Sequence, residues 1–100
     1  MSVQQGRIIV VTGANSGLGY ETTVALARKG AHVVMACRAL ERAQRAREEI
    51  EKSIPSATLD VLHLDLNSLR SIEAFSKSYL ERFDRLDVLI NSAGIMAPPR

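Results

Sequence analysis

The chain has 100 residues, of which 46% are hydrophobic and 24% charged, and it carries a formal net charge of +2. This length fits one domain or part of one, and this composition fits a folded chain with a buried core, so two complete domains and a disordered or fibrous protein are excluded. Basic and acidic residues are interleaved, which argues against nucleic-acid binding, while one cysteine and two histidines exclude an internal disulfide framework, argue against a structural zinc site and favour a reducing compartment.

Short apolar runs alternate with helical patterns along the chain. In order, the pattern predicts a strand at residues 7–12, a helix that ends near residue 30, a strand at 32–37, a helix at about 40–53, a strand at 57–64, a helix that begins after residue 67 or 68, and a strand at 86–92. The first, second and fourth apolar runs are nearly continuous in Val, Ile and Leu, which is typical of strands covered on both faces. The alternation therefore favours a parallel sheet over hairpins.

The three helical patterns carry apolar faces and end signals. The first helix is expected to bury Leu18, Thr22, Ala25 and Leu26. The second begins after Ala39, which has no side chain able to cap a helix, and the third begins with Asn67 or Ser68 as its cap. The third helix carries an apolar stripe made of Leu69, Ile72, Phe75, Tyr79 and Phe83.

Right-handed crossovers would arrange the four strands in parallel in the order 3-2-1-4. We therefore expect an α/β fold, part of a Rossmann-type doubly wound parallel sheet with four strands and three helices, in which the third helix alone covers one face. The strand order reverses between strands one and four, and ligands bind beyond the carboxyl ends of strands at such a switch point. The strand at 86–92 would form an open apolar edge, so we expect the isolated chain to be marginally stable or to self-associate.

A glycine-rich turn follows the first strand directly, with the sequence Thr12-Gly13-Ala14-Asn15-Ser16-Gly17-Leu18-Gly19. Gly13 permits a tight turn, Gly17 lets backbone N–H groups approach a pyrophosphate, and Gly19 allows a helix to pack closely on a strand. The helix that begins here presents unpaired N–H groups to an anion. The position of the turn after a first strand predicts a dinucleotide phosphate site rather than an ordinary strand-to-helix turn.

The end of the second strand indicates which dinucleotide would bind. An NAD site carries an acidic residue there, about 20 residues beyond the glycines, to hold the ribose 2′-hydroxyl. This chain has Cys37 at that position, followed by Arg38, whose guanidinium suits a 2′-phosphate. NADP(H) is therefore favoured over NAD(H). Arg38 could instead be a solvated residue at the start of a charged helix. Arg42, one turn further on, could help electrostatically or lie solvated on the surface, and Cys37 is expected to be a buried, inert thiol.

The spacing Gly-x-x-x-Gly-x-Gly after Thr12 resembles the short-chain dehydrogenase/reductase family. The pair Asp65-Leu66 and the segment 90–94, Ile-Asn-Ser-Ala-Gly, stand where that family has similar motifs. The resemblance implies that Asp65 contacts the adenine ring, that Asn91 steadies the central sheet, and that Ala93 and Gly94 pass close to the cofactor. Residues 36–38 and 94–99 look like the branch that contains retinol dehydrogenases and protochlorophyllide reductases. Ser92 replaces a second Asn, which leaves the hydrogen bonds at the strand end open.

The candidate cofactor contacts come from the turn, from the end of the second strand and from the resemblance. They are Gly13, Asn15, Ser16, Gly17, Leu18, Gly19, Arg38, Asp65, Leu66, Asn91, Ala93 and Gly94. No residue is assigned a catalytic or metal-binding role.

The proton donor that the resemblance implies is absent from these 100 residues. The family uses a Tyr-x-x-x-Lys pair, whereas Tyr20 is followed four residues later by Val24 and Tyr79 by Phe83. We therefore interpret residues 1–100 as the N-terminal, dinucleotide-binding part of a longer oxidoreductase that transfers hydride between nicotinamide and a carbonyl or alcohol substrate, and expect the isolated chain to be inactive. The alternative is a complete short protein that binds a nucleotide or a protein partner without catalysis. Either form could assemble as an oligomer.

The apolar runs bear on where the chain is located. None approaches the roughly 18 residues needed to span a bilayer, and the first seven residues lack the features of a signal peptide. We therefore expect no membrane-spanning segment in this chain and a location in the cytoplasm.

Overall fold

The computed structural model describes residues 6–15 and 17–92, in which strands and helices alternate throughout. The elements are β1 (Ile8–Thr12), α1 (Gly17–Arg28), β2 (His32–Cys37), α2 (Leu40–Ser53), β3 (Thr58–His63), α3 (Leu69–Arg82) and β4 (Val88–Asn91). All seven follow the predicted order. The second strand and second helix have the predicted bounds, and the other strands are shorter than predicted by one or two residues at an end. Within the described part of the chain, no helix is long and apolar enough to cross a membrane.

The four strands form one parallel sheet in the order β3-β2-β1-β4. β1 lies inside the sheet, with Ile9 in register with Val33 of β2 and with Val88 of β4. Residues 9–12 of β1 and 33–37 of β2 are buried because helices cover both faces of this part of the sheet. The strand order confirms the prediction, and it places the reversal of strand order between β1 and β4.

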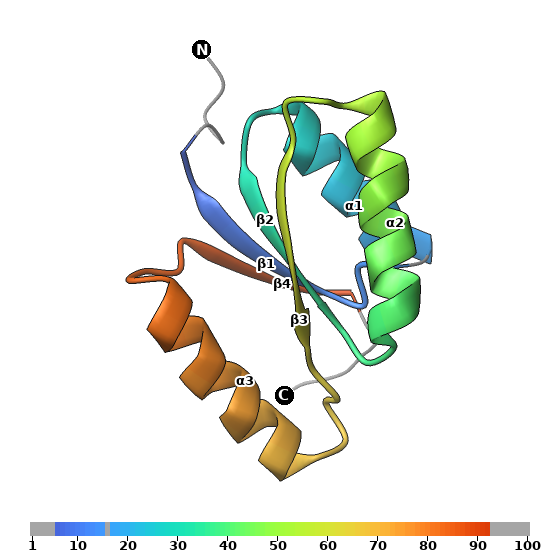
Figure 1. Cartoon of the computed structure of the whole chain (residues 1–100). Helices are drawn as coiled ribbons and strands as arrows, with labels where there is room; N and C mark the ends of the chain where they lie inside the picture. The colour runs from blue at the N-terminus through green and yellow to red at the C-terminus, as the bar shows by residue number, and fades with distance from the viewer. Residues whose placement is uncertain (1–5, 16, 93–100) are drawn as a thin grey trace.

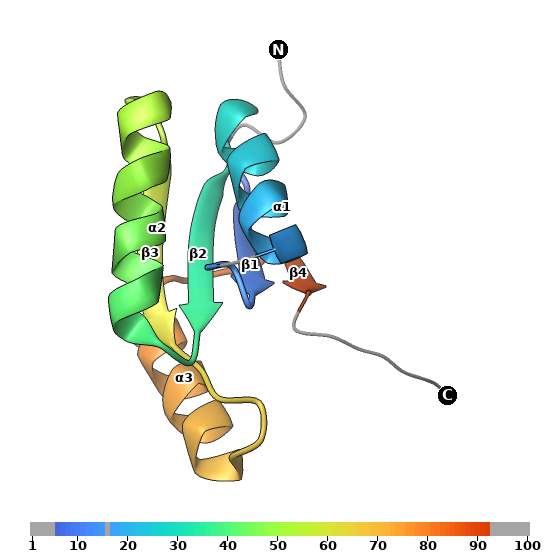
Figure 2. The ribbon, with the colours of Figure 1, turned by 90° about the vertical axis from the view of Figure 1, so that its right-hand side faces the viewer.

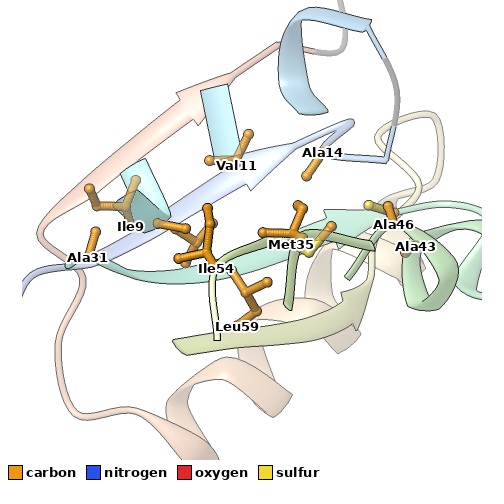
Figure 3. Close-up of a cluster of buried hydrophobic side chains, with 13 residues drawn as sticks. Ile9, Val11, Ala14, Ala31, Met35, Ala43, Ala46, Ile54 and Leu59 are labelled. Carbon is orange, nitrogen blue, oxygen red and sulfur yellow. The ribbon is translucent and has the colours of Figure 1, made fainter. Parts of the chain in front are cut away.

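The helices divide unequally between the two faces of the sheet. Figures 1 and 2 show α1 and α2 on one face and α3 on the other, as expected. The larger core lies between the sheet and α1 and α2, where Ile9, Met35 and Ile50 are almost fully buried (Figure 3). The smaller core lies under α3 and contains Val10 and Tyr79. The α1/α2 face therefore carries most of the apolar burial.

The buried face of α1 differs from the predicted one. Gly19, Thr23 and Ala27 are its buried residues, whereas Leu18 is 70% exposed and Ala25 is also exposed. The prediction was wrong for Leu18 and Ala25, since the short distance between α1 and the sheet selects other, small side chains. Leu26 is half-buried and packs against the larger core, as predicted. The hydroxyl of Thr23 is satisfied within this tight contact, since it donates to the carbonyl oxygen of Gly19 at 2.8 Å.

Gly19 shows how close this approach is. A Cβ at Gly19 would lie 2.6 Å from the Oγ of Ser92 and 2.8 Å from the carbonyl carbon of Gly13. Heavy atoms that are not bonded to each other do not approach so closely, and the Gly13 atom belongs to the backbone, which cannot rotate away. The first turn of α1 therefore packs directly on the chain that leaves β1, as predicted for the third glycine of the turn.

α3 is attached mainly at its C-terminal end. Its cap is Ser68, one of the two predicted residues, whose Oγ accepts a hydrogen bond from the N–H of Ser71 at 3.1 Å. Tyr79 is buried and its hydroxyl donates to the carbonyl oxygen of Arg85 at 2.7 Å. Leu69 was wrongly placed in the apolar stripe, because it is 79% exposed. The first turn of α3 projects beyond the sheet in both views, so no strand lies under it (Figures 1 and 2).

A pair of reciprocal hydrogen bonds joins the segment before β4 to the start of β1. The N–H of Asp87 donates to the carbonyl oxygen of Ile8 at 3.0 Å, and the N–H of Ile8 donates to Oδ2 of Asp87 at 2.8 Å. The Nε of Arg85 donates to the same carboxylate oxygen at 3.1 Å. The hydrogen bond from the Ile8 N–H, more than any other cause, holds the pKa of Asp87 below its usual value. This carboxylate therefore helps to set the register of β4.

We expect Gly19→Ala to destabilise the fold. The new methyl group collides with the backbone at Gly13, and overpacking of this kind costs about 2 kcal/mol, more than the roughly 1 kcal/mol by which alanine favours a helix interior. Urea unfolding followed by circular dichroism would measure the loss. Glu21→Ala, an exposed change on the same helix, should alter stability by less than about 0.5 kcal/mol. A Gly19→Ala protein as stable as wild type would show that α1 does not pack this closely.

We expect Asp87→Asn to change how stability depends on pH. Because the folded pKa of Asp87 is lowered, its ionised form stabilises the fold above the unfolded pKa of about 3.9, and this contribution is lost as the pH falls through the folded pKa. The variant should therefore melt at a lower temperature at neutral pH and lose less stability than wild type below about pH 4. Thermal unfolding over a series of pH values measures this. Asp84→Asn should show the same dependence of melting temperature on pH as the wild-type protein. If Asp87→Asn also did so, the stabilising role of the Asp87 carboxylate would be contradicted.

Candidate functional site

The carboxyl ends of the strands surround a cavity at the predicted switch point. Its volume is about 480 Å³, and it is lined by residues that follow β1, β2, β3 and β4. Five predicted site residues lie on its wall, namely Gly13, Asn15, Arg38, Asp65 and Leu66. The wall also contains residues that the sequence did not single out as contacts: Thr12, Ala36, Ala39, Arg42, Leu64, Asn67 and Ser92. One cavity thus collects groups from four separate segments of the chain.

The glycine-rich turn has the backbone conformation expected of it. Gly13 and Gly17 have φ values of +62° and +55°, in the left-handed region that favours glycine. The N–H of Gly13 donates to the carbonyl oxygen of Ala36 at 2.9 Å, which ties the start of the turn to β2. A Cβ at Gly17 would meet no protein atom within 4 Å, so this side of the turn is open. Ser16, another predicted contact, lies outside the described residues.

The ends of β1 and β4 are joined by side-chain hydrogen bonds. The hydroxyl of Thr12 donates to Oδ1 of Asn91 at 2.9 Å and accepts from the N–H of Ser92 at 3.1 Å. The hydroxyl of Ser92 donates to the carbonyl oxygen of Thr12. Asn91 does not line the main cavity, and it borders an apolar groove between β4 and α3 instead. Ala93 and Gly94 were predicted as further contacts and lie outside the described residues.

Positive charge gathers on the β2 side of the cavity. Arg38 directly follows β2, and Arg42 lies one helical turn further along, so that both line the cavity. Ala39 is the N-cap of α2 and makes no side-chain capping bond, as predicted, which leaves the first turn of the helix to present its N–H groups. Cys37 is buried, and this burial raises the pKa of its thiol. A neutral thiol at the end of β2 does not repel an anion.

The β3 side of the cavity carries a fixed carboxylate. Oδ1 of Asp65 accepts a hydrogen bond from the N–H of Asn67 at 3.0 Å, and the N–H of Asp65 donates to the Oγ of Ser71 at 2.7 Å. These bonds hold Asp65 between the end of β3 and the start of α3. Leu66, the next predicted contact, is 43% exposed and offers an apolar surface at the rim. The cavity is therefore cationic at one side and anionic at the other.

The two tyrosines lie away from the lining of this cavity. The hydroxyl of Tyr20 donates to Oε1 of Glu49 at 2.9 Å, and this hydrogen bond raises the pKa of Tyr20. Tyr79 is buried under α3, and burial raises its pKa. Both residues therefore have structural contacts, in agreement with the sequence interpretation. Within residues 6–15 and 17–92, no three His, Cys, Asp or Glu side chains gather in a way that could hold a metal ion.

Ser92 was not predicted as part of the site, and Arg42 was considered only as an electrostatic helper of Arg38, which it joins on the cavity wall. No local signal exists for Ser92, because its partners are about 80 residues away in the sequence. Gly17, Leu18 and Gly19 shape the turn and the start of α1 but do not line the cavity.

Comparison with known proteins agrees with this geometry. Human retinol dehydrogenase 13 is 40% identical over 94 residues, which are 94% of this chain and 28% of that protein. The solved structure of menthone neomenthol reductase from Mentha piperita has a TM-score of 0.82 and 37% identity, with 89% of this chain and 32% of that chain covered. A short-chain dehydrogenase from Escherichia coli CFT073 complexed with NADPH has a TM-score of 0.83 and 27% identity, covering 94% and 40%.

The similarity includes the whole described chain but only part of each relative. The present sequence spans less than a third of retinol dehydrogenase 13 and of the reductase from Mentha piperita. The sequence model of short chain dehydrogenases matches residues 7–100, which include every strand and helix of the fold. With this match, the parallel sheet in the order 3-2-1-4 and the glycine-rich turn at its switch point, the chain belongs to the short-chain dehydrogenase family.

Proposed function

We propose that this chain binds NADP(H) in the cavity at the carboxyl end of the sheet, as the cofactor-binding part of an oxidoreductase. The observation that carries the proposal is the combination, in one cavity, of Gly13 and Asn15 from the glycine-rich turn with the guanidinium groups of Arg38 and Arg42. The residues present fit a dinucleotide, because they offer a phosphate cradle, a second anion site and a carboxylate within one volume of about 480 Å³.

The pyrophosphate would lie against the turn between β1 and α1. Gly13 and Gly17 give the turn its two left-handed conformations, and the missing Cβ of Gly17 leaves room for close approach. α1 begins at Gly17 and adds the positive end of its dipole. Asn15 and Ser16 would complete this part of the site, and exposed Leu18 would flank it.

The 2′-phosphate would lie at the end of β2. Arg38 can offer two charge-assisted hydrogen bonds to it, and Arg42 adds a second positive charge on the same wall. Since neutral Cys37 occupies the position where an NAD site has an acidic residue, the site would accept the phosphate without repulsion. This arrangement favours NADP(H) over NAD(H).

The other walls of the cavity would contact the remaining parts of the dinucleotide. Asp65 keeps its second carboxylate oxygen for the adenine amino group, beside Leu66 at the rim. Asn91, Ala93 and Gly94 would lie toward the nicotinamide, which accepts or donates a hydride when it is bound. The names of the relatives support a carbonyl or alcohol substrate of lipophilic character. The cytoplasmic location stays a prediction.

A second candidate is a nucleotide-binding or protein-binding module without catalysis. It is favoured by the exposed edge of β4, where Leu89 is 59% exposed. Dinucleotide binding with no carbonyl or alcohol turnover in the longest soluble form of the protein would favour this candidate. Tight association with a protein partner, independent of nucleotide, would favour its protein-binding form.

We expect Arg38→Ala to remove the preference for NADPH. Loss of charge-assisted hydrogen bonds to the 2′-phosphate should weaken NADPH binding at least about tenfold and leave NADH binding unchanged. Isothermal titration with both nucleotides measures this. Arg28→Ala, at the far end of α1, is the matched control and should bind both like wild type. Equal affinity of the wild-type protein for NADPH and NADH would overturn the preference.

We expect Gly17→Ala to weaken the binding of either nucleotide at least about tenfold, because its methyl group would occupy the space in which the pyrophosphate approaches. Gly30→Ala is the control, since Gly30 also has a positive φ of +88° but lies at the other end of α1. Both variants should lose about 1–2 kcal/mol of stability through left-handed strain, and Gly30→Ala should keep its affinity. Titration and thermal unfolding separate the two effects. Undiminished binding by Gly17→Ala would remove the turn from the site.

A further inference from the structure

Ser92 makes contacts that reach from the end of β4 to the glycine-rich turn. Its hydroxyl donates to the carbonyl oxygen of Thr12, and its N–H donates to the hydroxyl of Thr12 at 3.1 Å. Thr12 is 3% exposed and is the last residue of β1 in register with β4, opposite Asn91. Ser92 also lines the main cavity. It therefore lies where the sheet ends and the turn begins.

The peptide group between Thr12 and Gly13 is held on both sides. Its carbonyl oxygen accepts from the hydroxyl of Ser92, and its N–H donates to the carbonyl oxygen of Ala36 at 2.9 Å. Because a peptide group is planar, two bonds on opposite sides set the orientation of the whole plane. The turn starts from this plane with the left-handed Gly13, so the orientation of the plane decides where the following N–H groups point.

The hydroxyl of Ser92 also fills the space left by Gly19. The position that a Cβ of Gly19 would take lies 2.6 Å from the Oγ of Ser92. The start of α1 therefore packs against the same hydroxyl that holds the Thr12 carbonyl. One oxygen atom connects β1, the turn and the helix N-terminus, which are the three parts of a phosphate cradle.

We propose that Ser92 is a positioning residue, whose hydroxyl holds the turn between β1 and α1 in the conformation that receives the pyrophosphate. The proposal rests on the function proposed above. Ser92 replaces the amide that the resembled motif carries at this place, so a hydroxyl performs the connection in this chain. Since the 2′-phosphate would be held by Arg38 at the end of β2, Ser92 acts on the part that NADPH and NADH share.

The test compares Ser92→Ala with Ser76→Ala, the same chemical change on the exposed side of α3. Ser92→Ala leaves the Thr12 carbonyl without its donor. We expect this change to weaken the binding of NADPH and of NADH by the same factor, about three- to tenfold. Arg38→Ala should weaken the binding of NADPH only, which separates the role of Arg38 at the 2′-phosphate from the role of Ser92 at the turn. Ser76→Ala should bind both nucleotides like wild type. Isothermal titration on the longest soluble form of the protein gives these affinities.

Hydrogen exchange in the nucleotide-free protein provides a second readout. Ser92→Ala should speed the exchange of the Gly13 N–H and of the N–H groups in the first turn of α1, while the N–H groups of α2 exchange as in wild type. If Ser92→Ala does not fold, Ser92→Cys keeps the size of the side chain with a weaker donor, and it should change affinity and exchange in the same direction.

Three outcomes overturn the proposal. Unchanged affinity in a less stable Ser92 variant would make the residue purely structural, and uniform acceleration of exchange over the whole chain would do the same. A loss of affinity for NADPH alone would place Ser92 at the 2′-phosphate instead. Wild-type protein that binds neither nucleotide would overturn the proposed function itself, whereas wild-type binding with unaltered Ser92 variants overturns this inference alone.

Discussion

The close contact between the first turn of α1 and the chain that leaves β1 is the constraint on which the site depends. It exists because Gly19 has no side chain, and a Cβ there would collide with the backbone at Gly13. The helix consequently starts at the level where the strands end, and the chain must turn back within a few residues. Gly13 and Gly17 make this turn possible because both adopt left-handed conformations. The helix dipole is thereby directed at the switch point of the sheet.

The strand order places this turn in the wall of a cavity that is positively charged on one side and negatively charged on the other. β1 lies between β2 and β4, so residues that follow neighbouring strands face each other across the switch point. Arg38 and the uncapped start of α2 make one side positive, while Asp65 makes the other negative. The two faces of the sheet support this end unequally, since the larger core lies under α1 and α2. The glycine-rich turn therefore lies on the better packed face.

Sequence reasoning succeeded where the signal is local. The bounds of α2, the cap at Ser68 and the missing cap at Ala39 follow from residues that are neighbours in the chain. It failed at Leu18 and Leu69, which are apolar but exposed. Hydrophobic periodicity identifies a candidate face, but it does not show how closely a helix approaches the sheet or whether the sheet extends under the whole helix. Gly19 and Thr23 are buried because they are small, and hydrophobic periodicity takes no account of side-chain size.

The sequence by itself determined the order of elements, the strand order and the position of the glycine-rich turn at the switch point, because apolar runs, glycine spacing and the handedness of crossovers are properties of short segments. Only the tertiary structure decided which residues complete the site. The hydroxyl of Ser92 meets the Thr12 carbonyl across 80 residues of sequence, and no pattern within either segment specifies that contact. Arg42 reaches the cavity wall beside Arg38 because the fold brings the start of α2 to the switch point. Distances between remote segments arise from packing, and packing is a property of the whole chain.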